Sequence, residues 1–482
     1  MASTVLPTLP CFLPKSNLPD GIDVAAVARE FATLGALGSD DVTSDAVWRD
    51  SVALTGTFRT FYSGAVAVAW TERCLARQAH AFQLNPGAAR VVRPAAGLGW
   101  IEVPFTFETK AAPTATCSGW VSLVPENGWK VWLLRTILEG FIDHPNVDDP
   151  QPLPITKDSA DYECVVIGCG QSGLSVAGRL QALGVSYLVV DKVPQVGESW
   201  LQRYESMKLH TPRESSHLPF GRTFTDEYPE FLSRQDLAQG YRATLLLHWV
   251  NLRILGCQQT QMDSASASRP NPQAHDVAKD MVETGLQSVT MIQRSQTCII
   301  PVEYMPKRAS AQIERNPERF DALERTGFRV DRSGDVFAHV HERYGGHYLD
   351  VGNCDNIVNG LVSLLFDDDT HLHADVVVFA TGFKQNVRDT VRTLFGEDVY
   401  NGVDDSWGLD KEGELRGAFR PSLHSNIWFL SGTSGHSRYF SRFIALLVKA
   451  DLDGQGGPAY RENPVALNCR GKYSLCSEGS GV

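Results

Sequence analysis

Residues 162–191, YECVVIGCGQSGLSVAGRLQALGVSYLVVD, decide the fold of the central part of the chain. The apolar stretch 162–167 predicts a short strand that runs directly into the glycine loop 168–173. Leucine and alanine then recur at helical spacing, and Gly184 is placed to end that helix. Residues 187–190 predict a second strand. This order of strand, glycine loop, helix and strand indicates a βαβ unit of an α/β fold.

The glycines of this loop have the spacing and the context of a dinucleotide-binding motif. Gly168, Gly170 and Gly173 form G-x-G-x-x-G between a strand and a helix. In this motif the first glycine permits the tight turn, the second lets a pyrophosphate approach, and the third allows close helix packing. Asp191 stands about 20 residues further on, where a carboxylate binds ribose hydroxyls and disfavours a 2′-phosphate. We therefore expect FAD or NAD rather than NADP, the alternative being a glycine turn that serves packing only.

Several short motifs follow this loop in a fixed order. They are VGESW at 196–200, RY at 203–204, LHTP at 209–212, PEFLS at 229–233 and FATGF at 379–383. In this combination the chain resembles the class B flavin monooxygenases. That family includes the flavin-containing monooxygenases, the Baeyer–Villiger enzymes and the auxin-forming indole-pyruvate monooxygenases of plants. The stretches ALTGT (53–57) and TFET (106–109) resemble the SnoaL-like, or nuclear transport factor 2-like, domain fused to such enzymes in fungi. Together the resemblance covers residues 20–450.

The resemblance implies a set of cofactor-binding residues. FAD would be held by Gly168, Gly170, Gln171, Ser172, Gly173, Asp191 and Lys192. Trp200, His210 and Thr211 would lie toward the flavin ring, and Thr381 and Gly382 on a strand that crosses back beside it. For these last five residues a packing or loop role is the alternative. No catalytic side chain is identified from spacing.

The resemblance also implies a function. We expect an FAD-dependent monooxygenase that uses NADPH and O₂ to oxygenate a small lipophilic metabolite, in secondary metabolism. Hydroxylation, epoxidation and Baeyer–Villiger oxidation are not distinguished. The alternative is a redox-inactive or NADPH-independent flavoprotein remnant whose SnoaL-like domain binds or cyclises the substrate.

The chain departs from the family where the second glycine motif should open an NADPH-binding domain. Residues 274–278 begin a helix, residues 288–293 form a strand, and Arg294 stands where the family binds the NADP 2′-phosphate. The loop that should precede them is replaced by residues 264–273, which contain no glycine. Three interpretations stay open: a gene model or transcript that has lost internal segments, a flavoprotein reduced by another donor, and a redox-inactive descendant.

The domain organisation follows from these motifs. We expect a Rossmann-like FAD-binding domain, a truncated second dinucleotide domain and an N-terminal α+β SnoaL-like domain. The expected boundaries are a leader (1–20), the SnoaL-like domain (21–149), a linker (150–160), the first FAD half (161–255), the NADPH remnant (256–350), the second FAD half (351–452) and a disordered tail (453–482). Helices are predicted over 24–37, 45–54, 65–82 and 441–449, and later strands over 375–379 and 426–430.

Composition excludes other classes of function. The formal net charge of −12 argues against nucleic-acid binding, because such proteins carry a basic face. No apolar run approaches the ~18 residues that span a bilayer. The ten cysteines lack metal-like spacing and indicate free thiols, and the proline-rich start predicts a cytoplasmic protein. For 367–373, with three aspartates and two histidines, a solvated turn is favoured over a metal site. A homodimer is compatible with the family.

Overall fold

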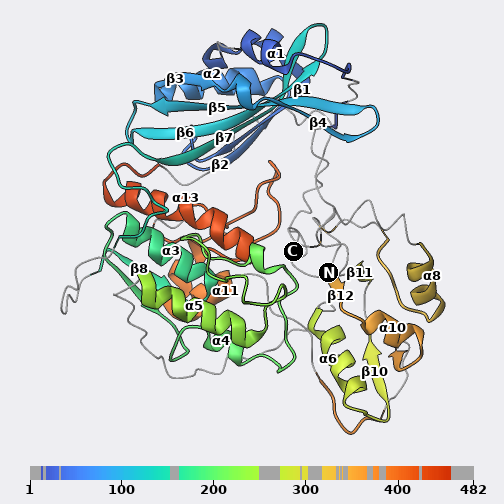
Figure 1. Cartoon of the computed structure of the whole chain (residues 1–482). Coiled ribbons are helices and arrows are strands. Elements are labelled where there is room, and N and C mark those ends of the chain that lie inside the picture. The colour runs from blue at the N-terminus through green and yellow to red at the C-terminus, as the bar shows by residue number, and fades with distance from the viewer. Residues whose placement is uncertain are drawn as a thin grey trace, which may run out of the picture.

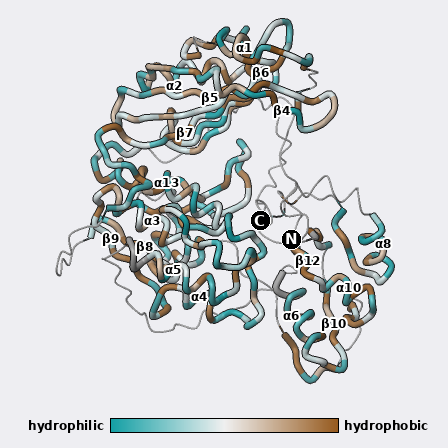
Figure 2. Tube along the Cα trace, viewed as in Figure 1, coloured by the Kyte–Doolittle hydropathy of each residue, from teal (hydrophilic) through white to brown (hydrophobic). Residues whose placement is uncertain are grey.

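A computed structural model describes residues 12–14, 18–31, 34–151, 162–248, 272–293, 296–301, 317–332, 336, 339, 346–365, 373–378, 387–422 and 426–457. These residues form three units, which can be followed in Figure 1. We call them the N-terminal unit (18–151), the nucleotide unit (162–248 with 387–457) and the second α/β unit (within 272–365). In Figure 2 hydrophobic residues recur in all three units, as expected when each part buries apolar surface.

The N-terminal unit is a seven-stranded mixed sheet with helices, as the predicted α+β class requires. The strand order is β2-β1-β7-β6-β5-β3 with β4 beside β5, and only β1 and β7 run parallel. In Figure 1 the helices α1 and α2 lie over one face of the sheet. The bounds are α1 Val24–Glu30, β1 Val42–Ser51, β2 Phe58–Tyr62, α2 Ala65–Arg77, β3 Ala79–Leu84, β4 Arg90–Ala95, β5 Leu98–Thr109, β6 Ala115–Pro125 and β7 Trp129–Phe141.

The helix boundaries predicted for this unit are partly wrong. Residues 45–54 lie in β1 and the turn that follows it, not in a helix. β1 pairs with β2 on one side and β7 on the other, and these ladders outweigh the helical spacing of its apolar residues. The helix predicted over 65–82 ends at Arg77, because Gln78 adopts a left-handed φ of 51° and the chain continues as β3. The helix predicted over 24–37 is α1, which ends at Glu30.

Aromatic side chains pack between α2 and the sheet. Trp48 stacks on Phe61 with ring centroids 4.8 Å apart, and it meets Trp70 edge-on at 5.2 Å. The indole nitrogen of Trp48 donates a hydrogen bond of 2.9 Å to the Thr136 hydroxyl. The buried Asp50 accepts hydrogen bonds from the same hydroxyl and from backbone N–H groups of the turn after β1. The polar atoms beside Trp48 are therefore paired inside the core.

The nucleotide unit begins with the predicted βαβ order. β8 (Cys164–Ile167), α3 (Gln171–Ala182) and β9 (Tyr187–Val190) follow one another, and the two strands pair in parallel. Gly184 has a φ of 70° just beyond α3, which confirms its predicted place at the helix end. The predicted C-terminal helix is confirmed and longer than expected, and it packs against α3. The other helices are α4 Glu198–Leu201, α5 Arg234–His248, α11 Arg388–Phe395, α12 Glu397–Asn401 and α13 Ser434–Leu452.

Two strands predicted near the end of the chain are not formed within the part of the chain that the structure describes. Residues 375–378 have no strand partner among the described residues, and Val376 and Val377 are 70% and 64% exposed. Residues 426–430 contribute only one bridge, from Trp428 to Pro421. An apolar run becomes a strand only when a neighbouring strand accepts its hydrogen bonds.

The second α/β unit has a core of its own. Its parallel strand pairs are β10 with β13 and β11 with β12. Because β13 pairs with β10 and α10 packs beside it, the unit extends beyond the boundary expected at residue 350. The bounds are α6 Pro272–Glu283, β10 Val289–Ile292, β11 Cys298–Pro301, α8 Pro317–Arg325, β12 His347–Asp350, α10 Asn353–Val358 and β13 Val362–Leu365. The helix and the strand predicted over 274–283 and 288–293 are thus confirmed.

Within the described ranges, no helix combines the length and the apolar character needed to cross a membrane. The same residues contain no group of three or more His, Cys, Asp or Glu side chains placed to hold a metal ion. Residues 367–371 lie outside the described part of the chain.

A buried histidine makes the second α/β unit sensitive to pH. His275 is 1% exposed, its ring stacks on Tyr348 with centroids 4.0 Å apart, and its Nδ1 lies 3.2 Å from the Asn353 side-chain nitrogen. Its Nε2 has no hydrogen-bond partner among the described residues. Burial lowers the pKa of His275 to about 4, so the folded unit holds this ring neutral.

We therefore expect stability to fall as the pH is lowered from 7 to 5. The unfolded chain takes up a proton at His275 near pH 6.5, whereas the folded chain does so only near pH 4. In His275→Phe, which keeps an aromatic ring beside Tyr348, the unfolding free energy should depend less steeply on pH across this window. Urea unfolding at pH 7 and pH 5 measures the difference. An unchanged pH dependence in the variant would contradict the assignment.

Candidate functional site

The glycine loop lies between β8 and α3, and its three glycines differ in what the structure around them requires. Gly168 has a φ of 105°, a conformation that residues with a side chain rarely adopt. A Cβ on Gly173 would lie 1.8 Å from the carbonyl oxygen of Gly168, so only glycine allows α3 to approach the loop this closely. A Cβ on Gly170 would meet no atom within 4 Å. The first and third glycines are therefore required by the fold, whereas the second leaves open surface against which a ligand can lie.

Asp191 lies beside this loop at the end of β9. Its carboxylate accepts hydrogen bonds from the backbone N–H of Cys169 at 2.5 Å and from that of Val193 at 3.1 Å. The carboxylate therefore braces the turn of the glycine loop, a role that the sequence analysis did not predict. The neighbouring Lys192 is exposed.

A cavity of about 490 Å³ opens at the N-terminus of α3. It brings together eight residues predicted from sequence, although they come from three separate segments. These residues are Gly168, Gly170, Gln171, Ser172, Gly173, Trp200, His210 and Thr211. Asp191 and Lys192 do not line it, and Arg294, Thr381 and Gly382 lie outside the described residues.

The N-terminus of α13 forms another edge of the cavity through three residues that the sequence analysis did not name. The cavity is lined by Gly432, Thr433 and Ser434, which lie far from the glycine loop in the sequence. Thr433 caps α13, because its hydroxyl accepts from the His436 backbone N–H while the His436 Nδ1 accepts from the Thr433 backbone N–H at 3.1 Å. Two helices thus begin at one cavity, and helix N-termini favour phosphate groups. The signal in the sequence was a run of small polar residues ahead of an apolar helix.

A carboxylate from the second α/β unit reaches the cavity residue His210. The Asp276 Oδ2 lies 3.2 Å from the Nε2 of His210 and accepts a hydrogen bond of 2.6 Å from the Tyr204 hydroxyl. Asp276 is only 8% exposed, and its other carboxylate oxygen has no partner among the described residues. Burial, together with the charge of Asp276, raises the pKa of Tyr204, so this hydroxyl remains a donor. Asp276 therefore orients His210, and it was predicted only as part of a helix.

Comparison with known proteins gives similarity in segments. No protein-family model matches the chain. Over 58 residues it is 45% identical to the uncharacterized oxidoreductase CzcO of Bacillus velezensis, which covers 12% of this chain and 17% of that protein. Over 198 residues it is 24% identical to the probable indole-3-pyruvate monooxygenase YUCCA8 of Arabidopsis thaliana, which covers 40% of this chain and 42% of that protein. The chain therefore spans less than half the length of these curated relatives.

In the segments matched by these curated relatives, the chain is similar to proteins named as an oxidoreductase and a monooxygenase. Among solved structures, a flavin-containing monooxygenase from Stenotrophomonas maltophilia aligns with 60% of this chain and 99% of its own, at 13% identity and a TM-score of 0.34.

Removal of the Tyr204 hydroxyl tests the contact between the two units. We expect Tyr204→Phe to lower the unfolding free energy by about 1.5–3 kcal/mol, because Asp276 loses a donor to a buried carboxylate. Urea unfolding followed by tryptophan fluorescence measures this change. Tyr228→Phe is the control, since the structure shows no hydrogen bond from that hydroxyl to any described residue. Equal effects of the two substitutions would contradict the role of the Tyr204 hydroxyl.

Proposed function

We propose that the chain binds FAD in this cavity and is an FAD-dependent oxidoreductase of the monooxygenase type. Its substrate would be a small lipophilic metabolite of secondary metabolism, which takes one oxygen atom of O₂ while two electrons from an external reductant and two protons convert the other to water. The observation that carries the proposal is the glycine cradle, which is closed against α3 at Gly173 and open to the cavity at Gly170. The names of the curated relatives that match segments of the chain support the same class of activity.

The described residues divide into groups with different tasks toward FAD. The backbone of the glycine loop and the start of α3 would bind the pyrophosphate, with Asp191 bracing the turn. Trp200 and Leu209 would exclude water from the rest of the cofactor. His210 would hold a proton at Nε2 toward Asp276, which leaves its Nδ1 for the cavity. When bound, FAD supplies the redox and O₂ chemistry, and the protein supplies binding, orientation and electrostatics.

The residues of the second α/β unit do not fit NADPH. The sequence has no glycine between Gly256 and Gly285, whereas the dinucleotide-binding motif needs glycines ahead of its helix for a pyrophosphate to approach the backbone. The first turn of α6 instead carries His275, which is buried against Tyr348. The residue predicted for the 2′-phosphate, Arg294, lies outside the described residues.

The N-terminal unit fits the SnoaL-like fold that we propose for it, with helices over one face of a curved mixed sheet. Its interior holds packed rings, among them Trp48, Phe61 and Trp70. This packing gives no support to the alternative in which the unit itself binds or cyclises the substrate.

Two glycine variants test FAD binding. The purified chain should bind added FAD and show its visible absorption after gel filtration. We expect Gly170→Ala to melt close to the parent chain yet bind FAD at least about tenfold more weakly, because the new methyl group projects into the cavity. Gly173→Ala should instead lower the melting temperature without FAD, since its Cβ would overlap the Gly168 carbonyl. Failure of the parent chain to bind FAD would overturn the proposal.

The donor of electrons can be tested on the same preparation. We expect dithionite to bleach the bound flavin rapidly, whereas NADPH should reduce it far more slowly, because α6 lacks a glycine loop. Anaerobic absorption near 450 nm follows both reactions. Reduction by NADPH as fast as by dithionite would show that a nicotinamide site exists in this chain.

A further inference from the structure

A hairpin at residues 407–416 projects from the nucleotide unit toward the N-terminal unit. The backbone N–H of Trp407 donates to the Arg416 carbonyl at 2.8 Å, and Leu409 and Leu415 form a bridge. Asp410 organises the tip, because its carboxylate accepts from the backbone N–H of Glu412 at 2.9 Å and of Glu414 at 3.0 Å. The tip therefore presents two glutamates in a defined conformation.

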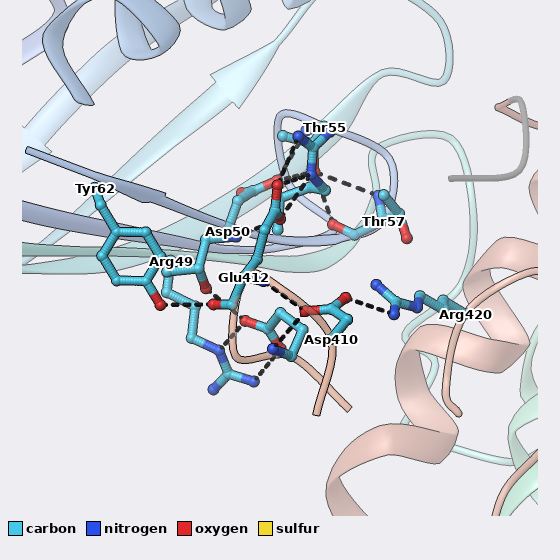
Figure 3. A network of polar contacts seen from close by, with 11 residues as sticks. Arg49, Asp50, Thr55, Thr57, Tyr62, Asp410, Glu412 and Arg420 are labelled. Carbon is cyan, nitrogen blue, oxygen red and sulfur yellow. Dashed lines mark hydrogen bonds and ion pairs between the residues drawn. The ribbon is translucent and has the colours of Figure 1, made fainter. Parts of the chain in front are cut away.

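Both glutamates form two-pronged ion pairs with arginines of the N-terminal sheet. Arg59 of β2 donates to Glu412 through Nε at 2.9 Å and Nη2 at 3.0 Å. Arg49 of β1 donates to Glu414 through Nε at 2.7 Å and Nη2 at 3.0 Å. The Tyr62 hydroxyl adds a hydrogen bond of 2.6 Å to the Glu412 carbonyl. Figure 3 shows Asp410 and Glu412 between Tyr62 and Arg49 on one side and Arg420 on the other.

We call these four residues the clamp (Arg49, Arg59, Glu412 and Glu414). The Arg49 side chain is 41% exposed, whereas the other three are largely removed from water. Arg59 is 6% exposed, and Glu412 and Glu414 are 2% and 4% exposed. Buried ion pairs add little net stability over apolar contacts, but removal of one partner leaves the other charge buried and unpaired, which is strongly unfavourable. We therefore expect such pairs to fix the relative orientation of the two units more than they increase the free energy of the contact.

The base of the hairpin continues this contact to the cavity. Trp407 meets the ring of His436 edge-on at 5.9 Å, and Phe419 stacks on the same ring at 6.1 Å. His436 caps α13, and a Cβ on Gly432 would lie 2.8 Å from its Nδ1, so the ring fits closely against the cavity-lining segment. The position of the hairpin therefore constrains the edge of the cavity at residues 432–434.

A second contact follows the same direction. Phe58 of β2, next to Arg59, meets the rings of Phe440 and Phe443 on α13 at 5.4 and 5.0 Å. Phe440 in turn stacks on Phe419 with centroids 3.8 Å apart. The sheet of the N-terminal unit thus touches α13 directly and through the hairpin.

We propose that the N-terminal unit is a positioning element of the cofactor cavity, which it holds in shape through the clamp, the hairpin and the capped N-terminus of α13. Arg59 and Glu412 are positioning residues in this scheme, since neither lines the cavity. This proposal rests on the proposed function in one respect: FAD is the ligand whose binding would report a change in the shape of the cavity.

Charge reversal and charge exchange test the proposal on the full chain. We expect Arg59→Glu and Glu412→Arg each to weaken FAD binding at least about tenfold and to alter the visible circular dichroism of bound flavin. Hydrogen exchange of the segment 432–440 should increase in both variants even without FAD. The double variant Arg59→Glu/Glu412→Arg should return both measurements toward those of the parent chain. Arg93→Glu, in an exposed pair with Asp20, is the matched control and should change neither.

The outcomes separate a positioning role from a structural one. If the single variants lower the melting temperature but leave both the exchange of 432–440 and FAD affinity unchanged, the proposal is overturned. If a reversal variant does not fold, Arg59→Lys keeps the charge without the two-pronged geometry and should show a smaller change in the same direction. If the parent chain binds no FAD, the proposed function fails, and exchange in the FAD-free chain still decides whether the clamp controls the α13 N-terminus.

Discussion

A buried guanidinium holds the helices α3 and α13 and the end of the N-terminal unit together. Arg179 is 3% exposed, and it donates to the Ser441 hydroxyl and the Arg438 carbonyl of α13 and to the Asp148 carboxylate beyond β7. Burial lowers the pKa of Arg179 to about 10, against the opposing charge of Asp148, so the group stays charged at neutral pH. A buried charge is costly unless its hydrogen-bond acceptors are all in place. Arg179 therefore links α3 and α13 to the segment that follows β7 in the N-terminal unit.

The cavity follows from this arrangement. α3 begins at the glycine loop, and α13, held beside it, begins at Gly432–Ser434 on the same cavity. Asp148 also pairs with Arg442, and although burial alone would raise its pKa, the two arginines hold that pKa below its usual value. The N-terminal unit thus contacts α13 through this carboxylate, through Phe58 and through the clamp. It is packed into the nucleotide unit instead of being joined to it by a linker alone.

The second α/β unit contributes to the cavity through a single helix. Its helix and strands pack around an apolar core, but the start of α6 holds a stacked histidine where a glycine loop would be needed for a dinucleotide. The same helix places Asp276 against His210 at the cavity. In the described residues, this unit therefore contributes a carboxylate to the site of its neighbour.

Sequence alone determined the features that depend on residues close together in the chain. The βαβ order around Gly168–Gly173 and the end of α3 at Gly184 need only local backbone preferences and hydrophobic periodicity. The grouping of Trp200, His210 and Thr211 with the glycine loop came from resemblance to a family, and the cavity agrees with it. Their binding to FAD is still a prediction.

Tertiary structure alone decided the features that depend on distant partners. Residues 45–54 have helical spacing, yet β7, which follows far along the chain, pairs with them as a strand. Asp276 and the clamp are recognised only when segments separated by 66 to 365 residues meet. No local sequence pattern predicts these contacts. A buried charged side chain is placed by the distant partner that pairs with it, not by its neighbours in the sequence.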